Sequence, residues 1–477
     1  MSKGECPIKF GTDGWRAIIA DEFTFDNVAK CAQATADYLR KSGLASRGVV
    51  VGYDTRFQAD AFADVVTQVL TANDVPVYLC ENPAPTPVIG HAILAHKAAG
   101  SIVLTASHNP AAYCGFKVRT EYGGAAPPET LVEIEANARS RWEQTPSRRE
   151  LDDARSSGLL EMIDPRPAYL THLANLVDIV ELRNAGLRVV IDPMHGAGAG
   201  YLRELLSGCT NEVWEVRGER NPAFPGMHNP EPIQRNLEMT VEAVRGHRAA
   251  VALCTDGDAD RIGVIDNNGR FVTQLQTYAL LAYYRLDVCG ERGALVKSVT
   301  TTSMINKLGE IYGVPVHETG VGFKFLGPKM RETNALMAGE ESGGFAFREH
   351  LPERDGVLSG LYMFDLMARR RADLPTLIEE LYAKVGPHYY DRIDITMTEV
   401  ERDRIAGLLP SLQPTEIAGL AVSHCDRTDG LRFVLPDGQW ALIRLSGTEP
   451  LMRIYTEVHS EDGVPAVLSA VRALTGA

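Results

Sequence analysis

The chain has 477 residues, of which 45% are hydrophobic and 23% are charged. This length exceeds what one hydrophobic core supports, and the composition is that of a globular protein with several domains. The formal net charge of −14 argues against a general nucleic-acid binder, because affinity for a phosphate backbone needs a basic surface.

The N-terminal sequence lacks the apolar core of a signal peptide, and no segment reaches about 18 consecutive apolar residues. We therefore expect a cytoplasmic protein without membrane contact. The eight cysteines are scattered and contain no CxxC pair, which predicts reduced thiols.

Several segments in chain order repeat one pattern, in which an apolar strand leads into a polar or glycine-rich turn and then into a helix. Strands that alternate with helices predict parallel sheets with helical cover. The last part differs, because its short alternating runs predict a mostly antiparallel sheet. We predict an α/β protein with domains at residues 1–150, 165–266 and 267–384, followed by a smaller α+β domain at 388–477.

The sequence TASHNP at residues 105–110 follows the apolar run SIVL at 101–104. It therefore places Ser107 where a buried strand ends, and ligands of open α/β sheets bind at such ends. Ser107 is either an ordinary loop residue or a nucleophile. A serine hydrolase is excluded, since no G-x-S-x-G elbow surrounds this serine.

Three aspartates, Asp256, Asp258 and Asp260, follow the apolar run at 249–254. At alternate positions they converge on one cation only if the backbone curls, which Gly257 would permit. Oxygen ligands suit Mg²⁺, and the alternative is a solvated acidic turn. An EF-hand is excluded, because Arg261 stands where that loop needs glycine.

Three weaker signals complete the pattern. The segment RLSGTEP at 444–450, with Arg453 beyond it, suits an anion-binding turn, although a hairpin with surface arginines is equally consistent. The loop GEESGG at 339–344 suits hydrogen bonding to sugar hydroxyls or is a surface turn. Lys117 and Lys324 each follow a phenylalanine, and either lysine alone is more often a solvated side chain than a catalytic one.

Together these segments resemble the α-D-phosphohexomutase family, and the match spans the whole chain in order. The family's active-site, metal, sugar and phosphate loops correspond to residues 105–110, 256–261, 339–344 and 444–450. The segment FGTDGWR at 10–16 is similar to the family's opening. The resemblance implies four domains around a central cleft, three of related α/β topology with mixed sheets and a smaller α+β C-terminal domain.

Within the family, the segment ETGVGFKF at 318–325 and the run Glu340-Glu341-Ser342 resemble phosphoglucomutases. Many phosphomannomutases and phosphoglucosamine mutases instead carry a histidine after Ser-Gly, where this chain has Gly344. This difference favours a glucose substrate and leaves the general acid–base group open.

The resemblance implies interconversion of glucose 1-phosphate and glucose 6-phosphate through a phosphoserine and a glucose 1,6-bisphosphate intermediate that also acts as activator. The alternatives are a phosphomannomutase or dual-specificity phosphohexomutase, a glucose 1,6-bisphosphate synthase, a phosphatase, or an inactive binding module. A hexose phosphate is the expected partner, with no nucleic acid, and the protein is expected to be a monomer or homodimer.

Residue roles follow from the same resemblance. Lys324 is the first candidate for the general base, because neighbouring cations could lower its pKa, and Lys117 is the second. His108 is expected only to orient the serine loop, and the C-terminal domain to close over the cleft. One Mg²⁺ would be held by Ser107, Asp256, Asp258 and Asp260, and further positive charge would come from Arg16, Arg261 and Lys117. The sugar would be bound by Glu340 and Ser342. Its phosphate would be bound by Arg444, Ser446, Gly447, Thr448 and Arg453.

Overall fold

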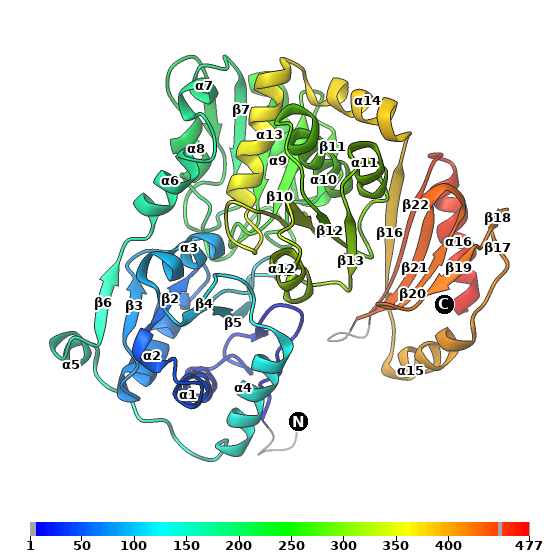
Figure 1. Ribbon diagram of the computed structural model, residues 1–477. Helices are drawn as coiled ribbons and strands as arrows, with labels where there is room; N and C mark the ends of the chain where they lie inside the picture. Colours follow the sequence, from blue (N-terminus) through cyan, green and yellow to red (C-terminus); the bar gives the residue numbers. More distant parts are fainter. Residues whose placement is uncertain (1–5, 447–450, 477) are drawn as a thin grey trace.

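The computed structural model of the protein describes residues 6–446 and 451–476, which form four units in chain order (Figure 1). The first three units are mixed sheets covered by helices, and the fourth is an antiparallel sheet with two helices. This confirms the predicted four-domain α/β architecture. Across the described residues, the helices are too short or too polar to cross a membrane.

The first unit has strands β1 (Trp15–Ile18), β2 (Val49–Tyr53), β3 (Val77–Cys80), β4 (Gly100–Leu104), β5 (Tyr113–Thr120) and β6 (Leu160–Ile163), with helices α1 (Phe25–Lys41), α2 (Ala59–Ala72), α3 (Thr86–His96), α4 (Pro128–Ser140) and α5 (Leu151–Ser156). Its strand order is β1-β5-β4-β2-β3-β6. Strands β2 and β4 are buried at every position, as central parallel strands require.

The second unit has strands β7 (Arg188–Asp192), β8 (Glu212–Glu215), β9 (Val251–Thr255), β10 (Ile262–Asp266) and β11 (Phe271–Val272), with helices α6 (Arg166–Ala174), α7 (Ile179–Arg183), α8 (Tyr201–Leu206) and α9 (Glu238–His247). Its strand order is β11-β10-β9-β7-β8. Strand β11 lies beyond residue 266, where we placed the end of this domain, and pairs with β10.

The third unit has strands β12 (Leu295–Ser298), β13 (Val316–Thr319), β14 (Met337–Gly339) and β15 (Phe345–Phe347), with helices α10 (Gln274–Tyr283), α11 (Met304–Tyr312), α12 (Phe323–Glu332), α13 (Gly356–Arg370) and α14 (Leu374–Val385). Its strand order is β13-β12-β14-β15.

The three α/β units share one topology. Each has three parallel strands and an antiparallel fourth, in the orders β5-β4-β2-β3, β10-β9-β7-β8 and β15-β14-β12-β13. In each unit the loop that leads from the third parallel strand into the antiparallel strand carries a candidate motif. The serine, metal and sugar loops therefore occupy equivalent positions at the carboxyl ends of parallel strands, where ligands of such sheets bind.

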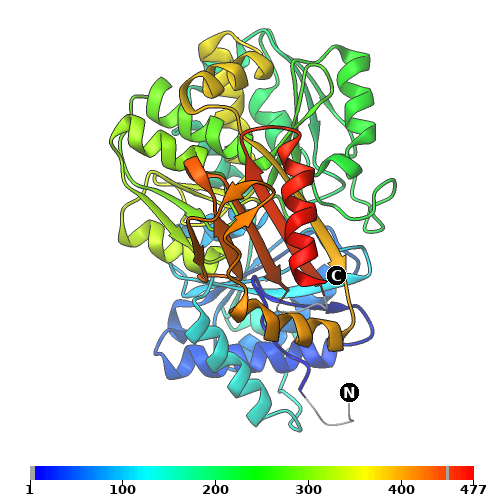
Figure 2. The same ribbon diagram turned by 90° about the vertical axis from the view of Figure 1, so that its right-hand side faces the viewer.

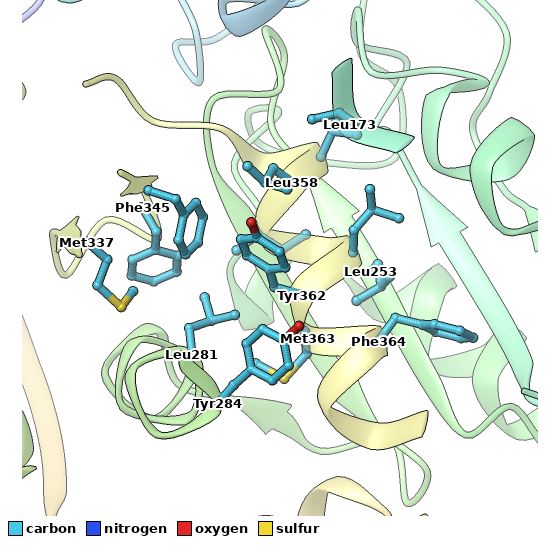
Figure 3. Close-up of a cluster of buried hydrophobic side chains, with 14 of the residues drawn as sticks. Leu173, Leu253, Leu281, Tyr284, Met337, Phe345, Leu358, Tyr362, Met363 and Phe364 are labelled. Carbon is cyan, nitrogen blue, oxygen red and sulfur yellow. The ribbon is translucent and has the colours of Figure 1, made fainter. Parts of the chain in front are cut away.

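Helix α13 joins the second and third units into one hydrophobic core. It packs on β9, β10 and α8 of the second unit and on α10 and β15 of the third. Figure 3 shows its Tyr362 and Met363 between Leu253 on one side and Leu281 and Phe345 on the other. This shared core fixes the metal loop relative to the sugar loop.

The fourth unit has strands β16 (Tyr389–Thr396), β17 (Glu416–Ile417), β18 (Leu420–Ala421), β19 (His424–Asp426), β20 (Leu431–Val434), β21 (Trp440–Leu445) and β22 (Leu451–Val458), with helices α15 (Glu399–Leu408) and α16 (Gly463–Thr475). Figure 2 shows α16 on the outer face of its sheet. Trp440, Leu442 and Tyr455 form a buried cluster with Val299 of the third unit, which docks the sheet there.

Candidate active site

Ser107 lies in the loop between β4 and β5 and is fully buried. Its φ of 52° is left-handed, which is uncommon for a residue with a side chain. Its N–H donates to Thr105 Oγ1 at 2.8 Å, and its Oγ donates to Asp256 Oδ2 at 2.7 Å. The serine loop and the metal loop therefore meet at this hydroxyl.

His108, which we expected only to orient the serine loop, lies beside the serine hydroxyl. Its Nδ1 lies 3.4 Å from Ser107 Oγ, because the left-handed backbone at Ser107 brings both side chains to one side. Burial lowers the pKa of His108 well below its usual value, and the nearby guanidinium groups of Arg261 and Arg16 lower it further. Both effects favour the neutral imidazole.

A buried arginine at the end of β2 holds the serine loop. Arg56 donates through Nη2 to the carbonyl oxygens of Ser107 at 2.6 Å and Asn109 at 2.7 Å. Its Nη1 donates to two further carbonyls of the loop at 2.9 Å, and Asp54 Oδ2 lies 3.1 Å from its Nε. Our sequence analysis did not single out Asp54 or Arg56, although an Asp-x-Arg sequence directly after a buried strand was a usable signal.

Removing Asp54 tests this anchor. Asp54→Ala leaves the completely buried Arg56 without its carboxylate partner, so we expect the free energy of unfolding to fall by about 3–5 kcal/mol. Urea denaturation measures this change. Asp60→Ala, on an exposed aspartate of α2, is the control and is expected to change stability by less than about 0.5 kcal/mol. Equal stabilities of the two variants would contradict the anchoring role.

Asp256, Asp258 and Asp260 each offer one carboxylate oxygen within 4.8 Å of the other two, and all three side chains are fully buried. The curl that brings them together is at Ala259, with a φ of 55°, rather than at Gly257 as we expected. Gly257 instead allows close approach of the loops, since a Cβ there would lie 2.5 Å from the Ser107 carbonyl oxygen.

These aspartates fit a divalent cation. The Oδ1 atoms of Asp258 and Asp260 are buried and accept no hydrogen bond from the described residues. Burial raises the pKa of Asp256 well above its usual range, and the two other carboxylates add to that rise. Buried carboxylate oxygens that accept no hydrogen bond, next to a serine hydroxyl, are the donor set that Mg²⁺ prefers.

Lys117 is fully buried among the acidic groups. Its Nζ lies 2.7 Å from Asp258 Oδ2, 3.2 Å from Asp260 Oδ2 and 2.8 Å from Asp13 Oδ2. Burial opposes its charge, but the three carboxylates outweigh burial and raise the pKa of Lys117. A lysine held in its protonated form supplies positive charge and is a poor general base.

The other predicted cations lie at the same loops. Arg16 Nη1 donates to Asn109 Oδ1 of the serine loop at 2.7 Å. Arg261 contacts its neighbour Asp260, with Nε 3.8 Å from Oδ1, and Glu231, with Nη1 3.3 Å from Oε1.

Arg354 is a buried cation that our sequence analysis missed. Its Nη2 lies 2.6 Å from Asp13 Oδ2 and 2.8 Å from Asp260 Oδ2, and its Nη1 lies 4.0 Å from Glu340 Oε2. It therefore connects the N-terminal, metal and sugar loops. The charged run Glu353-Arg354-Asp355 before α13 was the available signal.

The sugar loop contains two polar groups suited to a ligand. Glu340 Oε1 accepts a hydrogen bond from Gly322 N at 2.7 Å, and burial raises the pKa of Glu340 to about 7 against the opposing charge of Arg354. Ser342 Oγ is buried and has no hydrogen-bond partner among the described residues. A buried hydroxyl without a partner suits a ligand that supplies one.

Gly344 stands where many phosphomannomutases and phosphoglucosamine mutases of the family that the sequence resembles carry a histidine. A Cβ at this position would lie 2.2 Å from Arg354 Cδ. The stem of Arg354 thus fills the space that a side chain at position 344 would need, so a histidine does not fit without rearrangement.

Lys324 lies in the first turn of α12 and is half-buried. Its Nζ donates a long hydrogen bond of 3.4 Å to the carbonyl oxygen of Gly11. Burial lowers the pKa of Lys324, Asp13 and Asp429 oppose that shift, and Arg444 adds to it. The lowered pKa makes Lys324 better suited than Lys117 to accept a proton.

The predicted phosphate segment begins at the end of β21 and precedes β22 in the chain. Arg444 and Arg453 face each other across these strands, and opposed like charges destabilise a sheet unless an anion compensates them. Arg444 Nε donates to Asp429 Oδ1 at 2.9 Å, while Arg453 Nε lies 3.7 Å from Asp394 Oδ1. Ser446 is buried, and Gly447 and Thr448 lie outside the described residues.

Comparison with family models gives one match for each unit. Models of the phosphoglucomutase/phosphomannomutase α/β/α domains I, II and III match residues 7–145, 167–269 and 275–385. The model of the C-terminal domain matches residues 397–474.

Individual relatives match over nearly the whole chain. The chain is 33% identical over 459 residues to a phosphoglucomutase/phosphomannomutase of Thermococcus kodakarensis, covering 95% of each protein. It is 28% identical over 462 residues to a phosphoglucosamine/phosphogalactosamine mutase of Sulfurisphaera tokodaii, covering 95% of this chain and 96% of the relative. A crystal structure from Thermus thermophilus, described as that of a phosphomannomutase, superimposes with a TM-score of 0.85, 37% identity and 99% coverage of each chain. These names span several sugars, so the comparisons leave the sugar open.

Proposed function

The chain belongs to the α-D-phosphohexomutase family of isomerase-class phosphotransferases, and we propose that it interconverts glucose 1-phosphate and glucose 6-phosphate. The observation that carries the proposal is the position of Ser107, whose Oγ lies 2.7 Å from one carboxylate of a buried aspartate cluster. Its surroundings suit a phosphoryl carrier, because Lys117 and Arg261 contact the same cluster.

In the proposed mechanism the phosphoryl group moves between Ser107 and the sugar. The bond from phosphorus to Ser107 Oγ breaks as a bond to a free sugar hydroxyl forms, which gives glucose 1,6-bisphosphate. After this intermediate reorients, its other phosphoryl group returns to Ser107 Oγ. Phosphoryl transfer depends mainly on positioning and on neutralising charge on the transferred oxygens, and the basic residues at the serine and metal loops provide that charge.

Mg²⁺ would be held by Ser107, Asp256, Asp258 and Asp260, and when bound it would neutralise charge on the transferred phosphoryl group. The substrate's other phosphate would bind the Arg444 and Arg453 pair, with Ser446, Gly447 and Thr448. Glu340 and Ser342 would hydrogen-bond the sugar hydroxyls.

Lys324 would accept the proton of the attacking hydroxyl and return it in the reverse step. Within the described part of the chain its Nζ makes one long hydrogen bond, and burial lowers its pKa. A base is active when deprotonated, so turnover is expected to rise with pH through the pKa of Lys324, which lies below the usual lysine value.

Replacing this lysine with arginine tests the assignment. Lys324→Arg keeps the positive charge but cannot lose a proton in the working range, so kcat is expected to fall about 10²-fold and the rising limb of the pH profile to disappear. Lys329→Arg, at a partly exposed lysine of the same helix, is the matched control and should retain wild-type kinetics. A Lys324→Arg enzyme with an unchanged pH profile would assign the base elsewhere.

Phosphorus NMR of the protein with glucose 1-phosphate, Mg²⁺ and a trace of glucose 1,6-bisphosphate tests the proposal. Glucose 6-phosphate as the product supports the mutase, while release of inorganic phosphate indicates a phosphatase and accumulation of bisphosphate a synthase. Peptide mapping must find phosphate on Ser107. The ratio of kcat/KM values for glucose, mannose and glucosamine 1-phosphates decides the sugar, and Gly344 favours glucose over the other two.

A further inference from the structure

Asp429 lies on the loop between β19 and β20 and joins the phosphate segment to the loop before α12. Its Oδ1 accepts from Arg444 Nε at 2.9 Å, and its Oδ2 accepts from the backbone N–H of Val321 at 2.8 Å. Val321 belongs to the third unit and Asp429 to the fourth. One carboxylate therefore connects the two units at the edge of the candidate site.

The same carboxylate fixes the orientation of Arg444. This hydrogen bond uses the Nε–H of the guanidinium and not its two Nη groups, which are the donors suited to a bidentate contact with a phosphate. The side chain of Asp429 is 23% exposed, so solvent competes only partly for these hydrogen bonds.

The loop that Asp429 contacts also leads to Lys324. Its next residue, Gly322, donates its N–H to Glu340 Oε1 at 2.7 Å, so the segment 321–322 is held between a carboxylate of each unit. Lys324 follows two residues later in the first turn of α12. The position of this lysine is thus coupled to contacts made by the fourth unit.

We propose that Asp429 is a positioning residue that couples phosphate binding at Arg444 to the placement of Lys324 for proton transfer. This inference rests on the proposed function. Asp429 holds Arg444 through its Nε–H and anchors the loop that carries the base. Without the carboxylate, the phosphate contact and the loop become independent of each other.

The electrostatic surroundings of Lys324 supply a readout that a purely structural role would not change. The charged groups that affect it are Asp13 on the N-terminal loop and Asp429 and Arg444 on the fourth unit. Asp429 favours the protonated form, so removing its charge lowers the pKa of Lys324. The rising limb of the plot of kcat against pH, called the acid limb below, is then expected to move to lower pH.

Kinetics of Asp429→Asn test the proposal. We expect KM for glucose 1-phosphate to rise about tenfold and kcat to fall about tenfold, as for loss of a hydrogen bond to a charged group, with the acid limb shifted to lower pH. Calorimetric titration with inorganic phosphate is expected to show weaker binding, independently of turnover. Asp429→Glu, which restores the charge, is expected to return the acid limb to its wild-type position.

Asp426→Asn is the matched control, because Asp426 sits on the same hairpin and pairs with Arg432 at 2.8 Å. It is expected to keep KM and kcat within about twofold of wild type and to leave the acid limb at its wild-type pH. The proposal is overturned if Asp429→Asn behaves as wild type, or if both variants lose activity equally with an unmoved acid limb. Failure of the wild-type enzyme to isomerise hexose phosphates refutes the proposed function instead, and phosphate titration still tests the link between Asp429 and Arg444.

Discussion

Ser107→Ala is expected to lower the interconversion of glucose 1-phosphate and glucose 6-phosphate by at least ~10⁴-fold, because the variant lacks the oxygen that carries the phosphoryl group. A coupled assay of glucose 6-phosphate measures the loss, and intact mass must show that the phosphorylated species has disappeared. The serine loop should keep its shape, since Arg56 binds its backbone carbonyls and not the serine hydroxyl. We therefore expect a melting temperature within a few degrees of wild type.

Ser101→Ala provides the matched control for this prediction. Ser101 lies on β4, the strand that ends at the serine loop, and its buried Oγ has no hydrogen-bond partner among the described residues. The same chemical change at this position is expected to leave activity within about twofold of wild type. Retention of more than a tenth of wild-type activity by Ser107→Ala would exclude the phosphoserine mechanism.

The strand-end loops could be predicted from the sequence because each follows a buried apolar strand. Strands β4 and β9 are buried at every position and consist mostly of apolar residues, and the polar residues Ser107 and Asp256 appear just after those strands end. Local order along the chain is sufficient for this inference. The common topology of the three α/β units was implied only by family resemblance, since strand order depends on pairing between distant segments.

The contacts that assemble the site could not be predicted in this way. Arg354 pairs with Asp13, which is 341 positions away in the chain, and nothing in either local sequence identifies the other as its partner. The approach of His108 to Ser107 depends on a left-handed φ that short-range patterns did not indicate. Such contacts are set by how the units pack on one another.

Asp256→Asn is expected to lower activity by more than ~10³-fold and to remove the stabilisation that Mg²⁺ gives to the wild type. Asp256 accepts a hydrogen bond from the Ser107 hydroxyl. One of its carboxylate oxygens lies within 4.8 Å of an oxygen from each of the other two aspartates. The affinity of such a cluster for a hard cation depends on its charge, which an amide reduces. Thermal melting with and without millimolar Mg²⁺ measures the stabilisation.

In the metal-free protein, the same substitution is expected to leave the melting temperature unchanged or to raise it. Burial and the neighbouring carboxylates raise the pKa of Asp256, so its charged form costs folding free energy above its unfolded pKa. The neutral amide removes that cost, and Asp256→Asn in EDTA should melt at or above the wild-type temperature. Asp266→Asn is the control, because it replaces the carboxylate that accepts hydrogen bonds from two backbone N–H groups after β10. This variant should melt at a lower temperature than wild type but keep its response to Mg²⁺. A variant damaged by misfolding would melt lower in both conditions, so only the loss of a metal ligand predicts equal or greater stability in EDTA together with a lost response to Mg²⁺.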